Sequence, residues 1–190
     1  MNSNEVRDKG FEEVLAGFPQ DQVTLLMDFH RKNGGLSRYV KFRYFFENIR
    51  MENTNDVQIQ EYANKFSVIM LQLLLDEKLL IQETINFVEN NFEEYIMHIV
   101  SGSDQKELRA ICKYLDISKY FKTIEGSPTA KNILVRDIIK LNNYNKQTCV
   151  LIGDSINDFE AADINGIDFI GYGNNKNVLV KSNFDSFFNN

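Results

Sequence analysis

The 190-residue chain has no tryptophan, only two prolines and only two cysteines. Cys112 and Cys149 lie in apolar stretches without Cys-x-x-Cys spacing, so we expect two buried free thiols in a reducing compartment. The first residues, 1–5, have neither the basic start nor the apolar stretch of a secretory signal. The longest apolar run, residues 67–75, is too short to span a bilayer. These absences predict a soluble, cytoplasmic protein.

Blocks of basic residues are also missing. The net charge is −6 with a pI of about 5.0, and the lysines and arginines are dispersed along the chain. A nucleic-acid surface needs clustered cations against the phosphate backbone, and anionic membranes attract basic segments. We therefore expect neither nucleic acid nor a membrane as a partner. The composition is ordinary for a globular protein, and the length fits one domain or a core with a modest insertion.

The sequence before residue 80 has the hydrophobic periodicity of amphipathic helices and no convincing strand. Three segments show this spacing: 25–29, 39–49 and 59–74. Gly34-Gly35 separates the first segment from the second. The pattern predicts an all-α region over residues 4–79.

After residue 80, short apolar stretches alternate with helical patterns. The predicted strands are 95–100, 123–124, 148–152 and 169–170, and the predicted helices are 82–90, 104–115, 129–142 and 158–164. Short, wholly apolar strands separated by helices are typical of a parallel sheet that is covered on both faces. The predicted fold class is α/β: an all-α region over residues 4–79, followed by an incomplete doubly wound parallel core over residues 80–190.

Ligands of such cores bind where strands end and helices begin, so the residues after each predicted strand are candidates for a site. Ser101 and Gly102 directly follow the first strand. A hydroxyl and free backbone N–H groups at this position can bind a phosphate. The alternative is a helix N-cap, in which Ser103 or Asp104 satisfies the first turn and no ligand is involved.

Lys131 lies in the first turn of the helix that follows the second strand. A cation at this end opposes the helix dipole, which mildly favours a functional reason for the lysine. Its ammonium group could neutralise the charge of a phosphate as a point donor. The alternative is an exposed surface lysine.

Asp154 and Asp158 follow the most apolar strand of the chain. Both carboxylates can face the edge of the sheet if the turn between them is tight. Mg²⁺ is usually bound by one or two carboxylates together with a phosphate oxygen, so the pair predicts a magnesium site. The alternative is an aspartate helix cap with a solvated neighbour.

A hydroxyl, a lysine and an acidic pair at successive strand ends resemble the second, third and fourth motifs of the haloacid dehalogenase superfamily. The resemblance is to its phosphoglycolate phosphatase and β-phosphoglucomutase branch. The three stretches that carry it are Ile99-Val-Ser-Gly-Ser103, Gly126-Ser-Pro-Thr-Ala-Lys131 and Ile152-Gly-Asp-Ser-Ile-Asn-Asp158. The resemblance covers almost the whole chain and implies a Mg²⁺-dependent phosphatase.

The all-α region fits the same family, whose members insert a helical cap after their first motif. Gly35-Leu36-Ser37-Arg38 resembles the cap loop that faces the active site in the sugar-phosphate branch. On this resemblance Arg38 would bind a substrate anion, with Ser37 beside it. The alternative is a helix that is capped by Ser37 and followed by a surface arginine.

The first motif of the family is absent. Members begin with a strand that ends in Asp-x-Asp-Gly, in which the first aspartate forms an aspartyl-phosphate and the second is the general acid/base. The sequence contains no Asp-x-Asp; Met1-Asn2-Ser3-Asn4 resembles only the tail of that motif. In the family this strand lies between those that here are 96–100 and 149–152. We therefore expect a truncated core whose first strand is missing, with two strand edges left open.

Three explanations of this absence are open: a late start codon or disrupted gene, a relative that binds a phosphorylated ligand or a protein without catalysis, and an enzyme with another nucleophile. The resemblance implies a phosphatase of the phosphoglycolate phosphatase-like group that acts on a small phosphorylated metabolite, such as a sugar phosphate. It implies that Ser101, Gly102 and Lys131 bind phosphate and that Asp154 and Asp158 serve Mg²⁺. The chain as printed is predicted to be inactive, because it lacks the nucleophile.

Overall fold

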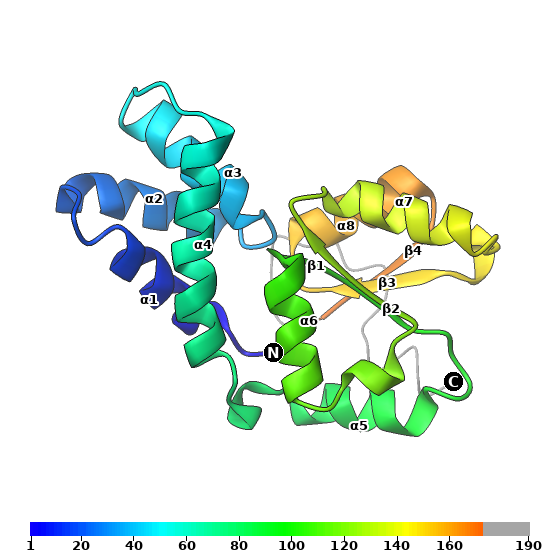
Figure 1. The fold of residues 1–190 in the computed structure, drawn as a ribbon. Coiled ribbons are helices and arrows are strands. Elements are labelled where there is room, and N and C mark those ends of the chain that lie inside the picture. Colours follow the sequence, from blue (N-terminus) through cyan, green and yellow to red (C-terminus); the bar gives the residue numbers. More distant parts are fainter. Residues whose placement is uncertain (173–190) are drawn as a thin grey trace. The chain divides into compact units, whose positions relative to one another are not determined.

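The computed structural model describes residues 1–172. The chain forms two compact units, shown in Figure 1. The first unit consists of Met1–Lys32 and Ser37–Pro128, and the second consists of Asn33–Leu36 and the chain from Thr129 onward. The first unit thus contains the all-α region except Asn33–Leu36, and also the first two strands. The predicted cap boundary at residue 80 stays a prediction, and the last part of the predicted 80–190 core lies outside the described residues.

The N-terminal part of the first unit is helical, as the periodicity predicts. Its elements are α1 (Asn4–Val14), α2 (Gln20–Lys32), α3 (Arg38–Tyr44), the π-helical turn η1 (Phe45–Ile49) and α4 (Asp56–Leu73). Ser37 and Asn55 are the N-caps of α3 and α4, and their side chains accept hydrogen bonds from Val40 N and Gln58 N. Such caps satisfy amide groups that have no partner inside the helix. No helix in the described part of the chain has the length and apolar character needed to cross a membrane.

Phenylalanine side chains fill the core of the first unit. Phe42 and Phe45 are fully buried, and Phe66 of α4 packs against Phe11 of α1 with ring centroids 4.4 Å apart. In Figure 1, α4 runs beside α1 and α3. The same apolar cluster continues through Ile111 and Cys112 to Ile124. The helices and the strands of the first unit therefore share one core.

The remainder of the first unit contains η2 (Glu77–Leu79), α5 (Gln82–Asn91), β1 (His98–Asp104), α6 (Gln105–Tyr114), η3 (Ser118–Tyr120) and β2 (Thr123–Ser127). β1 and β2 are parallel, with Ile99 opposite Ile124. Helix α6 lies against both strands, as Figure 1 shows. The pairing shifts register between Val100 and Asp104, so β1 is irregular where its polar residues begin.

The second unit contains α7 (Lys131–Leu141), η4 (Lys146–Thr148), β3 (Val150–Gly153), α8 (Ile156–Asn165) and β4 (Asp168–Gly171). β3 and β4 are parallel, with Leu151 opposite Phe169. Helix α8 packs on both strands and beside α7 (Figure 1). It begins with a capping box of Ser155 and Asp158, and it ends at Gly166, whose φ of 64° requires a residue without a Cβ penalty.

The described strands form two separate two-stranded parallel sheets, β1-β2 and β3-β4. Parallel strands alternating with helices confirm the predicted α/β class. Within residues 1–172, β1 pairs only with β2 and β3 only with β4, so each keeps one edge without a strand. Ile152 of β3 is 38% exposed, although fully apolar parallel strands are normally covered. The strand that is expected between β1 and β3 stays a prediction.

Candidate active site

The first of the three predicted strand ends, at the end of β1, combines a helix cap with a hydroxyl group. Asp104 is the N-cap of α6, and its carboxylate accepts from the amides of Lys106 and Glu107 at 3.0 and 3.1 Å. Because Asp104 fills the cap, the hydroxyl of Ser101 is not needed there. Ser101 Oγ donates to Ser103 Oγ and accepts from Ser103 N, both at 3.1 Å. Gly102 lies between them in the irregular part of β1.

The segments that follow β2 and β3, the second and third predicted strand ends, are joined by an ion pair between Lys131 and Asp158. Lys131 is the first residue of α7, and its ammonium group contacts Asp158 Oδ1. The two side chains are only 12% and 9% exposed, so Lys131 is not a surface lysine. Asp158 Oδ2 accepts from Ser155 N at 3.1 Å and Ser155 Oγ at 2.6 Å. Both carboxylate oxygens of Asp158 are therefore engaged: Oδ1 holds the ammonium group of Lys131, and Oδ2 is held by Ser155.

Asp154 is the residue of the acidic pair that suits a metal ion. It is exposed and lies between β3 and α8. Within residues 1–172 no group of three His, Cys, Asp or Glu side chains comes together. Mg²⁺ keeps several waters and takes only one or two carboxylates, so a single aspartate fits as part of its shell. The prediction of a magnesium site thus depends on Asp154, with Asp158 positioning Lys131.

The segment Asn33–Leu36 packs closely against the turn that follows β3. A Cβ atom built on Gly35 would lie 2.5 Å from Ser155 Oγ and 2.9 Å from Asn157 Cβ. Both residues begin α8, next to the aspartates. The glycine of the predicted cap loop is therefore needed because no side chain fits between this loop and the start of α8.

Gly35→Ala should destabilise the protein by about 1–3 kcal/mol, because the added methyl group would force the loop off α8. Gly34→Ala is the matched control, since a Cβ at Gly34 meets nothing within 4 Å. Urea unfolding of the two variants measures the difference. Equal midpoints for both variants would mean that the Asn33–Leu36 segment does not pack on α8 in solution.

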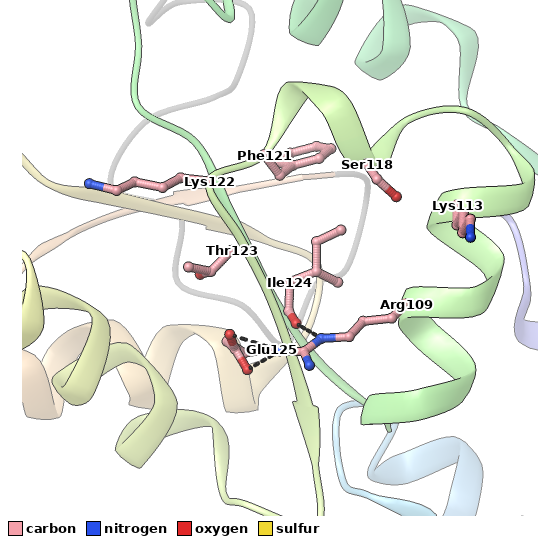
Figure 2. Close-up of a pocket in the computed structure, with 8 residues that line it drawn as sticks. All are labelled: Arg109, Lys113, Ser118, Phe121, Lys122, Thr123, Ile124 and Glu125. Atoms are coloured by element: carbon pink, nitrogen blue, oxygen red, sulfur yellow. Dashed lines mark hydrogen bonds and ion pairs between the residues drawn. The ribbon is translucent and has the colours of Figure 1, made fainter.

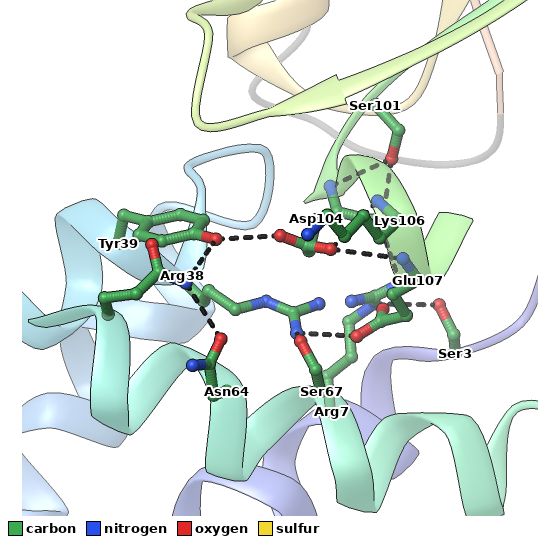
Figure 3. Close-up of polar contacts among 12 residues, drawn as sticks. Ser3, Arg7, Arg38, Tyr39, Asn64, Ser67, Ser101, Asp104, Lys106 and Glu107 are labelled. Atoms are coloured by element: carbon green, nitrogen blue, oxygen red, sulfur yellow. Dashed lines mark hydrogen bonds and ion pairs between the residues drawn. The ribbon is translucent and has the colours of Figure 1, made fainter. Parts of the chain in front are cut away.

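Arg38 lies in a buried ion pair instead of a solvent-facing position. Its Nη1 is 2.6 Å from Glu107 Oε2 and 2.7 Å from Ser67 Oγ, and its guanidinium covers the Phe66 ring at 4.5 Å. The side chains of Arg38 and Glu107 are 2% and 0% exposed. Figure 3 shows Arg38 between α3, α4 and Glu107 of α6. Ser37 caps α3, as the alternative interpretation of this loop predicts.

A contact between Arg38 and a substrate would require this pair to open. Breaking a buried ion pair costs about 3–5 kcal/mol, because one charge stays buried without compensation. A charge-assisted hydrogen bond to a substrate returns about 1.5–3 kcal/mol. The comparison favours a closed pair, with Arg38 as a structural residue.

The polar cluster around Arg38 contains residues that the sequence did not single out. Arg7 of α1 donates to Ser3 Oγ at 3.2 Å and to Ser103 Oγ at 2.9 Å. Tyr39 Oη donates to Asp104 Oδ2 at 2.7 Å. Figure 3 shows Arg7, Tyr39 and Asp104 converging from α1, α3 and the end of β1. A single arginine on an amphipathic helix carries no sequence signal for such a role, because most arginines lie at the surface.

A second buried polar network joins α1, α2 and α3. Lys41 Nζ lies 2.7 Å from His30 Nδ1, and His30 Nε2 lies 3.1 Å from Asp8 Oδ1. Burial lowers the pKa of His30 to about 4 and that of Lys41 to about 7. The imidazole is therefore neutral near pH 7 and connects Lys41 to Asp8. None of the predicted site residues belongs to this network.

A pocket of about 410 Å³ lies along β2, between this strand, α6 and η3. Arg109 closes one side of it by an ion pair with Glu125 at 3.1 Å and a hydrogen bond to the Ile124 carbonyl at 2.9 Å, both drawn in Figure 2. The rest is lined by Lys113, Ser118, Phe121, Lys122 and Thr123. The pocket contains none of the predicted site residues, so it is not the candidate active site.

Parallel strands with a lysine–aspartate ion pair at their ends define an α/β protein with a candidate site at the strand ends. The family model described as "haloacid dehalogenase-like hydrolase" matches residues 1–172. The chain belongs to this family. No curated protein matches the sequence.

Solved structures share the fold at low sequence identity. A haloacid dehalogenase-like family protein from Streptococcus pneumoniae is 15% identical, covers 99% of this chain and 84% of its own, and has a TM-score of 0.62. A predicted phosphoglycolate phosphatase from Haemophilus somnus is 18% identical, with coverages of 94% and 84% and a TM-score of 0.68. A variant of CbbY from Rhodobacter sphaeroides, in complex with xylulose 1,5-bisphosphate, is 12% identical, with coverages of 97% and 88% and a TM-score of 0.72.

Proposed function

We propose that this polypeptide belongs to a Mg²⁺-dependent phosphatase of the phosphoglycolate phosphatase-like group. Its substrate is a small phosphorylated metabolite, such as a sugar phosphate, in the cytoplasm. The observation that carries the proposal is the buried Lys131–Asp158 ion pair, with Asp154 beside it at the end of β3. A buried lysine that is held by a fixed carboxylate is suited to a phosphate group.

Each proposed residue has one role. Ser101 and Lys131 bind the phosphate, by a hydroxyl hydrogen bond and by charge. Asp158 is a positioning residue, because it holds the ammonium group of Lys131 and shares the capping box with Ser155. Asp154 would be a ligand of Mg²⁺, which when bound neutralises charge on the phosphoryl oxygens. Arg38 is left out of the proposed site because it pairs with Glu107.

Catalysis also needs a carboxylate nucleophile, and no Asp-x-Asp occurs in the printed sequence. We propose that a strand carrying this motif pairs with the open edge of β1. This strand has one edge without a strand within the described residues, which supports the proposal.

A second candidate function is phosphate binding without catalysis. The absence of Asp-x-Asp favours it, because the phosphate-binding serine and lysine are present while the nucleophile is not. Both candidates predict that phosphate binds. They differ in whether adding the motif yields turnover.

Asp154→Asn should lower kcat/KM by about 10²-fold or more in a chain that carries an added Asp-x-Asp-Gly strand. The amide keeps the size of the side chain but removes the charge that a metal requires. Asp163→Asn is the control, since Asp163 is an exposed residue of the same helix region. Steady-state kinetics with an aryl phosphate at several Mg²⁺ concentrations would show the loss, and full activity of Asp154→Asn would remove Asp154 from the site.

A further inference from the structure

The strand β2 has an outer edge that no other strand covers within the described residues. β2 pairs with β1 and with no further strand in that part of the chain. The pocket of about 410 Å³ lies along β2, and Thr123, Ile124 and Glu125 are among the residues that line it. The approach to the strand is therefore open. An uncovered edge presents backbone N–H and C=O groups to which another strand can bind.

The side chain of Gln105, the first residue of α6, bonds to the backbone of β2 on both sides of Glu125. Gln105 Nε2 donates to the carbonyl oxygen of Ile124 at 3.1 Å, and Gln105 Oε1 accepts from Gly126 N. A residue of a neighbouring parallel strand makes the same two bonds, to the carbonyl before the residue opposite it and from the amide after that residue. The Gln105 amide therefore occupies the place of an added strand.

Arg109, one turn further along α6, fills the remaining acceptor position of the Ile124 oxygen. Its Nε atom donates to that oxygen at 2.9 Å, as Figure 2 shows. A carbonyl oxygen has two lone pairs, and Gln105 and Arg109 use both of them. The Ile124 oxygen is thus closed to a hydrogen bond from a further strand.

Glu125 holds both side chains in these positions. It accepts from Gln105 Nε2 at 2.8 Å, and its two carboxylate oxygens accept from Arg109 Nη2 at 3.2 and 3.1 Å. Gly126 lets the start of α6 come this close, because a Cβ atom on it would lie 2.5 Å from the Ser103 carbonyl oxygen and 3.0 Å from Gln105 Cα. The two side chains are therefore held by a carboxylate as well as by the backbone of β2.

The strand that this contact would exclude is the β2 strand of a second copy of the chain. An edge strand carries both donors and acceptors, so two copies can pair antiparallel about a two-fold axis without another partner. Thr123 and Ile124 are β-branched residues, which favour strand pairing. Because the pocket leaves the approach to β2 open, exclusion has to come from hydrogen bonding and not from steric cover.

We propose that Gln105 and Arg109 form an autoinhibitory contact that prevents the edge of β2 from pairing with a second copy of the chain. Gln105 takes the two backbone hydrogen bonds that the second strand would make, and Arg109 fills the last acceptor position. Removing both side chains frees the edge. The inference concerns self-association and is independent of the proposed function.

The test compares the self-association of the unaltered chain with that of the double variant Gln105→Ala, Arg109→Ala. Because the double variant frees the Ile124 oxygen and the Gly126 amide of each copy, its dimerisation Kd should be lower by about tenfold or more. Sedimentation over a range of protein concentrations measures this constant. Lys113→Ala is the matched control, since Lys113 is an exposed residue of α6 that lines the same pocket and carries the same charge as Arg109. It should associate as the unaltered chain does.

Amide hydrogen exchange at Gly126 shows which surface associates. At low protein concentration, this amide should exchange faster in the double variant than in the unaltered chain, because Gln105 no longer accepts from it. As the concentration rises and the double variant dimerises, the amide should become protected. Association through the open edge of β1 would leave it unprotected.

The variant Gln105→Asn decides the question if the double variant does not fold. It keeps an uncharged amide but draws it back by one methylene group from β2. We expect faster exchange at Gly126 and a dimerisation Kd that is lower by about threefold, because Arg109 still covers the Ile124 oxygen. The inference is overturned if the folded variant associates no more tightly than the unaltered chain and Lys113→Ala. It is equally overturned if tighter association leaves the Gly126 amide unprotected.

Discussion

The chain as printed should hydrolyse no phosphate ester above background, and an added Asp-x-Asp-Gly strand ahead of Met1 should give Mg²⁺-dependent turnover. Family chemistry passes through an aspartyl-phosphate, and the described aspartates near the site have other roles. Asp158 holds Lys131, and Asp104 caps α6. Removing a nucleophile from an enzyme lowers kcat by on the order of 10⁵–10⁶-fold, which is a loss to background in practice.

The measurement is release of phosphate from a panel of sugar phosphates, phosphoglycolate and an aryl phosphate, with Mg²⁺ and with a chelator. The matched control carries the same added strand with Asn in place of its first Asp, and it should be as silent as the printed chain. Mg²⁺-dependent turnover by the printed chain, abolished by one aspartate substitution, would require a nucleophile that the motifs do not contain.

Much of the second half of the fold could be predicted from sequence. Apolar stretches that alternate with helical patterns predict the parallel strands β2, β3 and β4, because a covered parallel sheet needs wholly apolar strands. The expectation that ligands bind where strands end also selects Lys131 and Asp158, and their side chains form an ion pair in the structure. Their roles were harder to predict, since the sequence does not show that both oxygens of Asp158 are engaged.

The position of β1 shows where apolar content misleads. The prediction was 95–100, whereas the strand is His98–Asp104. Tyr95 and Ile96 are 44% and 64% exposed and lie before the strand. The strand continues through polar residues instead, because Asp104 pairs with Ser127 of β2. The C-terminal end of β1 is therefore determined by backbone pairing with β2, which is distant in sequence, and no local sequence pattern predicts it.

The buried cluster around Arg38 could not be predicted for the same reason. Arg7, Arg38 and Glu107 are far apart in sequence and lie on three different helices. Each is most simply interpreted as a surface charge, since arginine and glutamate are almost never fully buried unless they are paired. Only the packing of α1, α3 and α6 brings the charges together, and this packing makes Glu107 a residue with a large expected effect.

Glu107→Ala should destabilise the protein by about 3–5 kcal/mol, the cost of leaving a buried cation without its partner. The carboxylate is fully buried against Arg38, and its charge also acts on Arg7. Its removal leaves the buried guanidinium group of Arg38 without an ion-pair partner. Urea unfolding measures the loss, with Glu12→Ala as the control because Glu12 is exposed on α1 and should change stability by less than about 0.5 kcal/mol.

A double variant tests whether the loss comes from charge or from packing. Arg38→Met with Glu107→Leu removes both charges and keeps apolar volume, and such replacements of buried pairs are often neutral or stabilising. We therefore expect the double variant to be more stable than Glu107→Ala, even though it changes more atoms. A loss below about 1 kcal/mol in Glu107→Ala would mean that water reaches the pair in solution. Arg38 would then be free to leave Glu107, and its predicted contact with a substrate anion would again be energetically accessible.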